Sequence, residues 1–260
     1  YKIRATSSTT LDGVTDTQTS ATALAFDVAG TATKLSVTTQ PVGAGSGAAF
    51  ATQPVVKVLD VNDIVVESST ASITVSASAG TLSGTTTLSA TNGVATFTDL
   101  TFAGTAATNY TLSFASTGLT SATSSNFTVS VGAATQLVLT TSAAGSAYGS
   151  AFTTQPVVEI RDAGGNKVTT ATNQVTASLS SGTVVGTGNS TAVAGVATFS
   201  GLGITATPGS VTVTYSATGL TSATQSITVA KGTNTVTFTR SEEHTSELQS
   251  HHDLVCRLLL

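Results

Sequence analysis

The chain has 260 residues, of which nine are Lys or Arg and thirteen are Asp or Glu, giving a formal net charge of −4. Only 8% of the residues are charged, so the sequence gives no electrostatic reason to bind nucleic acid or an anionic membrane. It also lacks the run of about 18 apolar residues that a membrane-spanning helix requires.

The N-terminal segment 1–31 resembles the end of a longer unit whose beginning is missing. Ser20-Ala21-Thr22 and Phe26 recur later in the chain as Ser121-Ala122-Thr123 and Phe127, all at one offset. The chain starts inside this pattern, without a basic-then-apolar signal segment. We therefore interpret residues 1–31 as the C-terminal part of a truncated repeat and expect the chain to be a fragment of a longer array.

Two complete units follow. Residues 49–56 (AFATQPVV) return at 151–158 (AFTTQPVV), Asp60 returns as Asp162, and 93–97 (GVATF) returns at 195–199. This constant offset, about 100 residues, is the length of one small domain with a modest core. We predict repeats at 32–132 and 133–232, and the first strand of a further copy at 233–239.

Within each unit the apolar residues alternate with Thr and Ser, which is the pattern of half-buried β-strands. Ile73, Val75 and Ala77 share one predicted face, and Thr74 and Ser76 the other. For the aromatic residues in such runs, core packing is favoured over a sugar-stacking surface; they are Tyr110, Phe114, Phe127 and Tyr215. About seven short strands per unit, separated by Gly- and Asn-rich turns, predict a β-sandwich.

Two local signals are specific. Asn92-Gly93, placed between two apolar runs, predicts a tight hairpin because both residues tolerate positive φ. Gln53-Pro54 and Gln155-Pro156 precede strongly apolar runs, and Pro at such a place marks the start or the edge of a strand. Phe50 and its copy are expected to fill the core.

The phrase AFxTQPVV, the Asp that follows it and GVATF resemble bacterial Ig-like repeats, and the resemblance covers nearly all of residues 1–239. It implies an all-β fold of tandem Ig-like β-sandwich domains in a linear array. Such repeats occur in large secreted or cell-surface bacterial proteins, many of them adhesin-like. One departure is the replacement of the Gly-rich turn 162–166 (DAGGN) by 60–64 (DVNDI), which leaves the conformation of the first loop open.

Catalysis is not expected. Residues 1–239 contain no His and no Cys, so no Ser or Thr has an evident base to activate it. No pair of carboxylates is marked out by the repeat, and we predict neither catalytic nor cofactor-binding residues. The chain is therefore interpreted as a non-enzyme.

One cluster of oxygen ligands invites a metal hypothesis. Asp60, Asn62, Asp63 and Glu67 carry the ligand types that Ca²⁺ prefers, and Ca²⁺ stiffens some extracellular arrays. The spacing lacks a full acidic loop pattern, and Asp162 has only Asn166 nearby. A plain Asx-type turn accounts for both copies and is favoured over calcium.

The C-terminal segment 240–260 differs in kind from the rest. It matches the in-frame translation of a short-read sequencing adapter carrying an index, and we interpret it as a non-native tail. All His residues and the only Cys lie here, and with Asp253 they include the ligand types of a zinc site; they are His244, His251, His252 and Cys256. Because of the adapter match, no zinc site is assigned.

The predicted function is structural: a stalk or spacer in a secreted or cell-surface bacterial protein. Two alternatives stay open, namely that the repeats themselves form an adhesive head for host or matrix glycans or proteins, and that they are an accessory stalk of an extracellular hydrolase. The short junctions at 29–32 and 131–134 predict a semi-rigid monomeric rod in which neighbouring repeats are the main partners. Each domain should add about 35–40 Å to its length.

Overall fold

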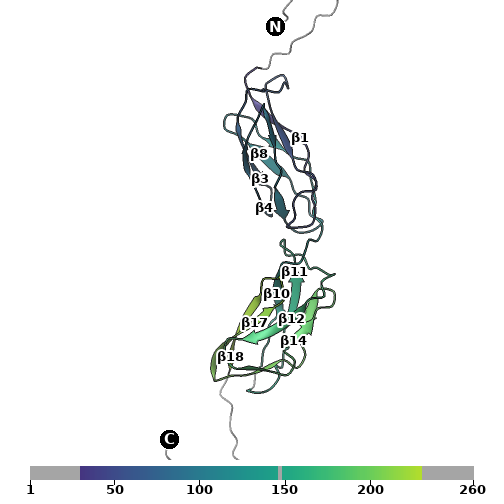
Figure 1. Cartoon of the computed structure of the whole chain (residues 1–260), viewed down its shortest axis with the longest axis vertical. Helices are drawn as coiled ribbons and strands as arrows, with labels where there is room; N and C mark the ends of the chain where they lie inside the picture. Colours follow the sequence, from purple (N-terminus) through teal and green to yellow (C-terminus); the bar gives the residue numbers. More distant parts are fainter. Residues whose placement is uncertain (1–29, 146–147, 230–260) are drawn as a thin grey trace, which may run out of the picture.

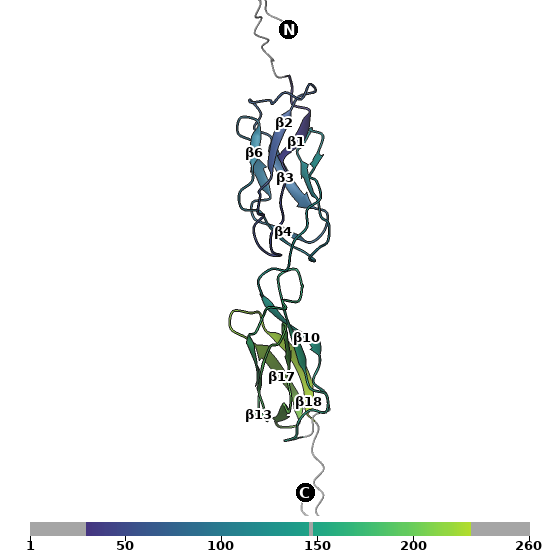
Figure 2. The same cartoon turned by 90° about the vertical axis from the view of Figure 1, so that its right-hand side faces the viewer.

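The computed structural model describes residues 30–145 and 148–229, and within these ranges it contains 18 β-strands and no helix. The strands form two domains with separate hydrophobic cores, joined end to end along the long axis of the molecule (Figures 1 and 2). The predicted all-β fold of sandwich domains in a linear array is confirmed. The predictions for the rest of the truncated repeat, for the further copy and for the tail 240–260 fall outside the described residues.

The first domain consists of two main sheets and a short two-stranded ribbon. One sheet has three strands in the order β1 (Lys34–Thr39), β2 (Val55–Leu59) and β6 (Val94–Thr96). The other has four in the order β5 (Thr87–Ser89), β3 (Ser72–Ala77), β8 (Leu112–Ala115) and β9 (Ala122–Thr123). The ribbon pairs β4 (Thr81–Ser83) with β7 (Thr101–Ala103).

The second domain repeats this topology. Its three-stranded sheet is β10 (Gln136–Thr141), β11 (Val157–Arg161) and β15 (Val196–Thr198). Its four-stranded sheet is β14 (Asn189–Thr191), β12 (Gln174–Leu179), β17 (Gly209–Ser216) and β18 (Ala223–Val229). Its ribbon is β13 (Thr183–Val185) with β16 (Gly203–Thr205).

The sheet order is that of an immunoglobulin-type sandwich. The first, second and fifth main strands form one sheet, and the third, fourth, sixth and seventh form the other. The register is also repeated. Lys34 pairs with Leu59 and Gln136 with Arg161, and the first strand of each domain has an irregularity at the same place, after Val37 and after Leu139. Nine strands per domain exceed the predicted seven because three-residue strands leave almost no periodic signal in the sequence.

Both local signals are confirmed. Asn92 (φ 51°) and Gly93 (φ 71°) form a two-residue turn between Thr91 and Val94, which exchange two backbone hydrogen bonds of 2.9 and 3.0 Å. Pro54 and Pro156 each stand directly before a strand, where the missing N–H costs no ladder bond. Phe50 and Phe152 are buried in their cores, as expected.

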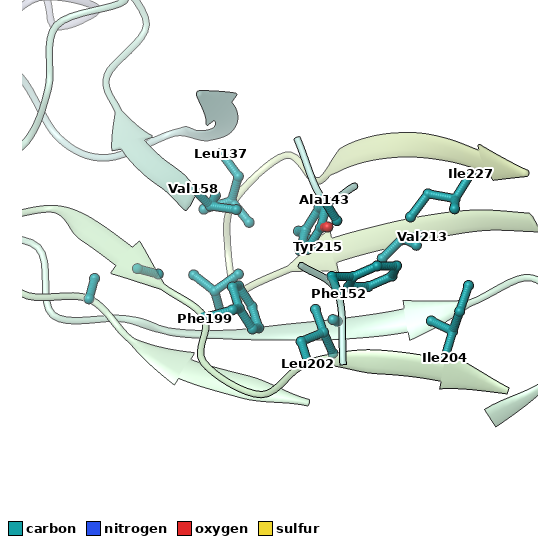
Figure 3. Packing of buried hydrophobic residues seen from close by; sticks show 14 of the residues in the cluster. Leu137, Ala143, Phe152, Val158, Phe199, Leu202, Ile204, Val213, Tyr215 and Ile227 are labelled. Carbon is teal, nitrogen blue, oxygen red and sulfur yellow. The ribbon is translucent and has the colours of Figure 1, made fainter. Parts of the chain in front are cut away.

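The cores differ in their aromatic content. In the first domain four rings lie against one another, with neighbouring centroids 4.7–6.2 Å apart; they are Phe50, Phe102, Tyr110 and Phe127. In the second, Phe199 and Tyr215 form the aromatic pair at 5.5 Å, and aliphatic side chains fill most of the remainder (Figure 3). All the aromatic residues predicted to pack inward are buried.

The two buried tyrosines have opposite polar environments. The Tyr110 hydroxyl accepts a hydrogen bond from the Thr105 N–H (2.8 Å) and donates one to the Thr105 carbonyl (3.2 Å), which ties the corner before β8. The Tyr215 hydroxyl is buried without a hydrogen-bond partner in the described protein, and burial raises its pKa to about 12. Phe114 holds the corresponding position of the first domain.

We predict that Tyr215→Phe increases the free energy of unfolding of the second domain by about 1 kcal/mol, because it removes a buried hydroxyl that lacks a partner. The matched variant Phe114→Tyr should destabilise the first domain by a similar amount. Native-state hydrogen exchange, which separates the two domains, measures both values. A clear destabilisation by Tyr215→Phe would contradict this account of the hydroxyl.

Candidate functional site at the domain junction

A buried aspartate follows the second strand of each domain and connects its own loop to the linker that enters the domain. Asp162 follows β11 and Asp60 follows β2, and both side chains are almost completely buried. A carboxylate only accepts hydrogen bonds, so its burial requires that donors surround it. Here the donors come from the aspartate's own loop and from the linker that enters the domain.

At Asp162 the carboxylate accepts backbone N–H bonds from Gly132 (2.8 Å), Gly164 (2.9 Å) and Asn166 (2.9 Å). The Asn166 side-chain amide donates to it as well, at 3.0 Å from either oxygen. The Asp162 carbonyl in turn accepts from the Gln136 side chain at 2.8 Å. One aspartate thus fixes the turn, the beginning of β10 and the glycine of the preceding linker.

Asp60 repeats this arrangement with other neighbours. Its carboxylate accepts from the backbone N–H groups of Gly30 (2.7 Å), Asn62 (2.9 Å) and Ile64 (2.9 Å). Asp63 adopts φ 66° where Gly165 has φ 82°, so the loop 60–64 has the conformation of the Gly-rich loop 162–166 despite its different residues. The loop conformation left open by the sequence is therefore the same in both copies.

The other acidic residues of the calcium hypothesis do not face the Asp60 carboxylate as a common site. Asp63 pairs with the Lys34 amine at 2.8 Å, in an ion pair whose Asp63 side chain is 75% exposed, and Glu67 is exposed. The Asp60 oxygens are faced by N–H groups, in the Asx-type turn favoured from the sequence. In the part of the chain that the structure describes, no three His, Cys, Asp or Glu side chains lie close enough together to hold a metal ion. Calcium binding at this loop, the less favoured interpretation of the sequence, stays a hypothesis.

Hydrogen bonds give the Asp60 carboxyl a distinct acidity. The N–H groups of Gly30 and Ile64 lower its pKa from the ordinary 3.8, burial opposes them, and Asn62 and the charge of Lys34 add smaller contributions. The pKa of Asp99 is lowered too, because the Thr85 hydroxyl (2.7 Å) and N–H groups bind its carboxylate. Both groups favour the folded state in their charged form.

Asn166 reaches across the junction into the first domain. Its side-chain NH₂ donates to the Gly104 carbonyl (2.9 Å), and its side-chain carbonyl accepts from the Ala106 N–H (2.9 Å). Gly104 belongs to the segment after β7, which the buried Ser46 hydroxyl holds through bonds of 3.0 and 3.1 Å. The second domain therefore binds a braced segment of the first.

Small residues allow this close approach. A Cβ atom at Gly132 would overlap the Ser46 carbonyl, and one at Gly164 would overlap the Gly104 carbonyl and the Ser46 hydroxyl. A Cβ at Gly47 would lie 2.8 Å from the Ala163 methyl. The junction is a close contact of glycines, Ala163 and Ser46, and a larger side chain at these glycines would separate the domains.

Sequence reasoning identified the short linker and the repeated aspartate but missed Ser46, Gly104 and Asn166 as junction residues. A usable signal was present, because Gly30 precedes Asp60 by the same sequence separation as Gly132 precedes Asp162. Nothing in the sequence indicated that the segment after β7 faces the next domain, because that depends on the orientation of the two domains.

An open groove of about 460 Å³ lies on the second domain, between the beginning of β12 and the end of β17. Its lining is polar and small and consists of Asn173, Gln174, Thr176, Ser216, Ala217 and Thr218. Residues 30–145 and 148–229 include no helix that is long and apolar enough to cross a membrane.

The sequence matches no protein-family model and no curated protein. Among solved structures, it is similar to Parabacteroides merdae β-glucuronidase (12% identity, TM-score 0.29), covering 75% of this chain and 24% of that one. It is also similar to the Yersinia pseudotuberculosis adhesin InvE (18% identity, TM-score 0.30), covering 75% of this chain and 58% of that one. A third similar structure is a C-terminal fragment of intimin, solved with the intimin-binding domain of its translocated receptor (15% identity, TM-score 0.27). The match covers 77% of this chain and 64% of that fragment. This chain thus spans less than two thirds of each of these proteins, and such low scores assign it no activity or partner.

We expect Asp162→Ala to lower the free energy of unfolding of the second domain by about 2–4 kcal/mol, because three backbone N–H groups lose their acceptor. Asp63→Asn serves as the control, since its ion pair is exposed and should contribute less than about 1 kcal/mol. Urea unfolding monitored by residue-resolved hydrogen exchange measures both. Equal effects of the two variants would refute the role assigned to Asp162.

Acid should destabilise the first domain through Asp60. A folded-state pKa below the ordinary 3.8 means that the stabilisation is complete above that value and is lost as the pH falls through the lower folded pKa. Asp60→Asn should flatten this acid dependence, and the Asp60→Asn, Asp99→Asn double variant should flatten it further. Urea midpoints measured between about pH 5 and pH 2 test this expectation. If the midpoint of Asp60→Asn depends on pH as steeply as that of the unaltered chain, the Asp60 carboxylate is not the cause of the acid dependence.

Proposed function

We propose that this chain is a segment of a structural stalk in a large secreted or cell-surface bacterial protein. The observation that carries the proposal is the junction, where Asp162 holds the linker at Gly132 and Asn166 binds Gly104 and Ala106. A flexible tether would need none of these bonds. A stalk needs them, because it must transmit position from one domain to the next.

The surface supports the same role. Exposed strand positions are mainly Thr and Ser, and charged residues make up 8% of the chain, so the domains offer hydrated surfaces without a strong field. A spacer of this composition holds a distal binding or catalytic part away from the cell and makes few contacts of its own. We propose that this stalk lies outside the cell.

The second candidate is an adhesive head, and the polar groove between β12 and β17 favours it. Its amide and hydroxyl groups are of the kind that bind sugar hydroxyls, although no aromatic side chain lines it. Immobilised host and matrix glycans separate the two functions. Glycan binding by the unaltered chain that disappears in the Asn173→Ala, Gln174→Ala variant would support the adhesive head. If the unaltered chain binds no glycan, the result supports the stalk.

The stalk predicts one narrow inter-domain distance distribution. Spin labels at Ser89→Cys in β5 and Thr191→Cys in β14, which are equivalent exposed positions, allow the measurement by double electron–electron resonance. Cys256→Ser removes the only other thiol of the chain. A control with a Gly-Ser insertion after Gly132 should give a broad distribution. If the unaltered linker is as broad as this control, the stalk proposal fails.

A further inference from the structure

The loop 60–64, at the end of the first domain where Gly30 enters, has the same backbone conformation as the loop 162–166, which is docked in the junction. In each, the aspartate N–H donates to the carbonyl at the last position of the loop at 2.9 Å, and the aspartate carboxylate accepts from the linker glycine. The linker glycine is therefore bound to both loops in the same way. What differs is the set of side chains that each loop offers to the unit before it.

The docked loop depends on three of its side-chain positions. Ala163 lies against Gly47, Gly164 lies against Gly104 and Ser46, and Asn166 makes the two inter-domain hydrogen bonds. Gly165 contributes nothing to the contact, since a Cβ atom there would have no neighbour within 4 Å.

In the loop 60–64 all three positions have changed. Val61 replaces the alanine and is 72% exposed, Asn62 replaces the close-packed glycine, and Ile64 replaces the bridging asparagine. A side chain at position 62 occupies the space that the neighbouring carbonyl uses in the described junction. An isoleucine at 64 can neither donate to that carbonyl nor accept from the next N–H.

A partner for this surface is indicated by the chain itself. Residues 20–26 align with 121–127, so the segment leading into Gly30 resembles the segment leading into Gly132. The sequence thus predicts that the unit preceding the first domain is of the same repeat type. Its C-terminal end would face Val61 as the end of the first domain faces Ala163.

We propose that the loop 60–64 is the docking surface for a preceding repeat of this type, and that this joint is wider and more mobile than the joint at Gly132. Its contact is apolar, through Val61, and lacks the two amide hydrogen bonds. The array then contains two kinds of joint, one stiff and one compliant. They are specified by residues 61, 62 and 64 of the first loop and by the counterparts 163, 164 and 166 of the second. This inference rests on the proposed stalk function.

The test transplants the loop of the first domain into the described junction. The variant Ala163→Val, Gly164→Asn, Gly165→Asp, Asn166→Ile keeps Asp162 and sets the sequence of loop 60–64 against the end of a repeat. In the spin-labelled full chain, we expect a longer mean inter-domain distance and a distribution that broadens toward that of the lengthened-linker control. Gly165→Asp alone should leave the distribution unchanged, because a Cβ atom at that position would have no neighbour within 4 Å.

The outcomes separate the two proposals. A narrow distribution in both the unaltered chain and the transplant overturns the unequal joints and leaves the stalk intact, whereas a broad distribution in the unaltered chain overturns both. Hydrogen exchange of β11 and β12 verifies that the second domain of the transplant is folded. If it is not, Asn166→Ile alone, which keeps the loop glycines, must still broaden the distribution, and a narrow result there contradicts the inference.

Discussion

The structure of the junction depends on one acceptor group, the carboxylate of the aspartate that follows the second strand of each domain. Asp162 binds the N–H of Gly132, a residue that belongs to neither core, and at the same time closes its own loop. Hydrogen bonds to a charged acceptor are among the strongest in proteins, and burial removes the competing water. The linker is thereby made part of the domain that follows it.

Once the linker is fixed, small differences in side-chain size determine how closely the two domains can pack against each other. The described junction uses Gly132, Gly164 and Gly47 to bring backbones together and Asn166 to bond them. The fold of the repeat is insensitive to these choices, since the loop 60–64 reaches the same conformation with Val, Asn, Asp and Ile. Orientation between domains can therefore vary along an array while the domains themselves stay alike.

Much of the fold was predictable because its signals are local. Asn92-Gly93 and the two Gln-Pro pairs specify a turn and two strand starts through backbone preferences of the residues themselves. The alternation around Tyr110, Leu112 and Phe114 specifies which face is buried. The junction was predicted only as a short joint, because the contacts of Ser46, Gly104 and Asn166 join residues far apart in the sequence, across two separately folded domains. The unsatisfied hydroxyl of Tyr215 was equally invisible, since an alternating pattern treats tyrosine and phenylalanine alike.

The most direct test of the central claim is the hydrogen-exchange rate of the Gly132 amide, measured by NMR under native conditions. If Asp162 holds the linker, this amide is protected and exchanges only when the second domain or its loop opens, at a rate close to those of the Gly164 and Asn166 amides that share the same carboxylate. An exchange rate typical of a solvent-exposed linker would show that the clamp does not persist in solution, and the account of a stiff joint would fail with it.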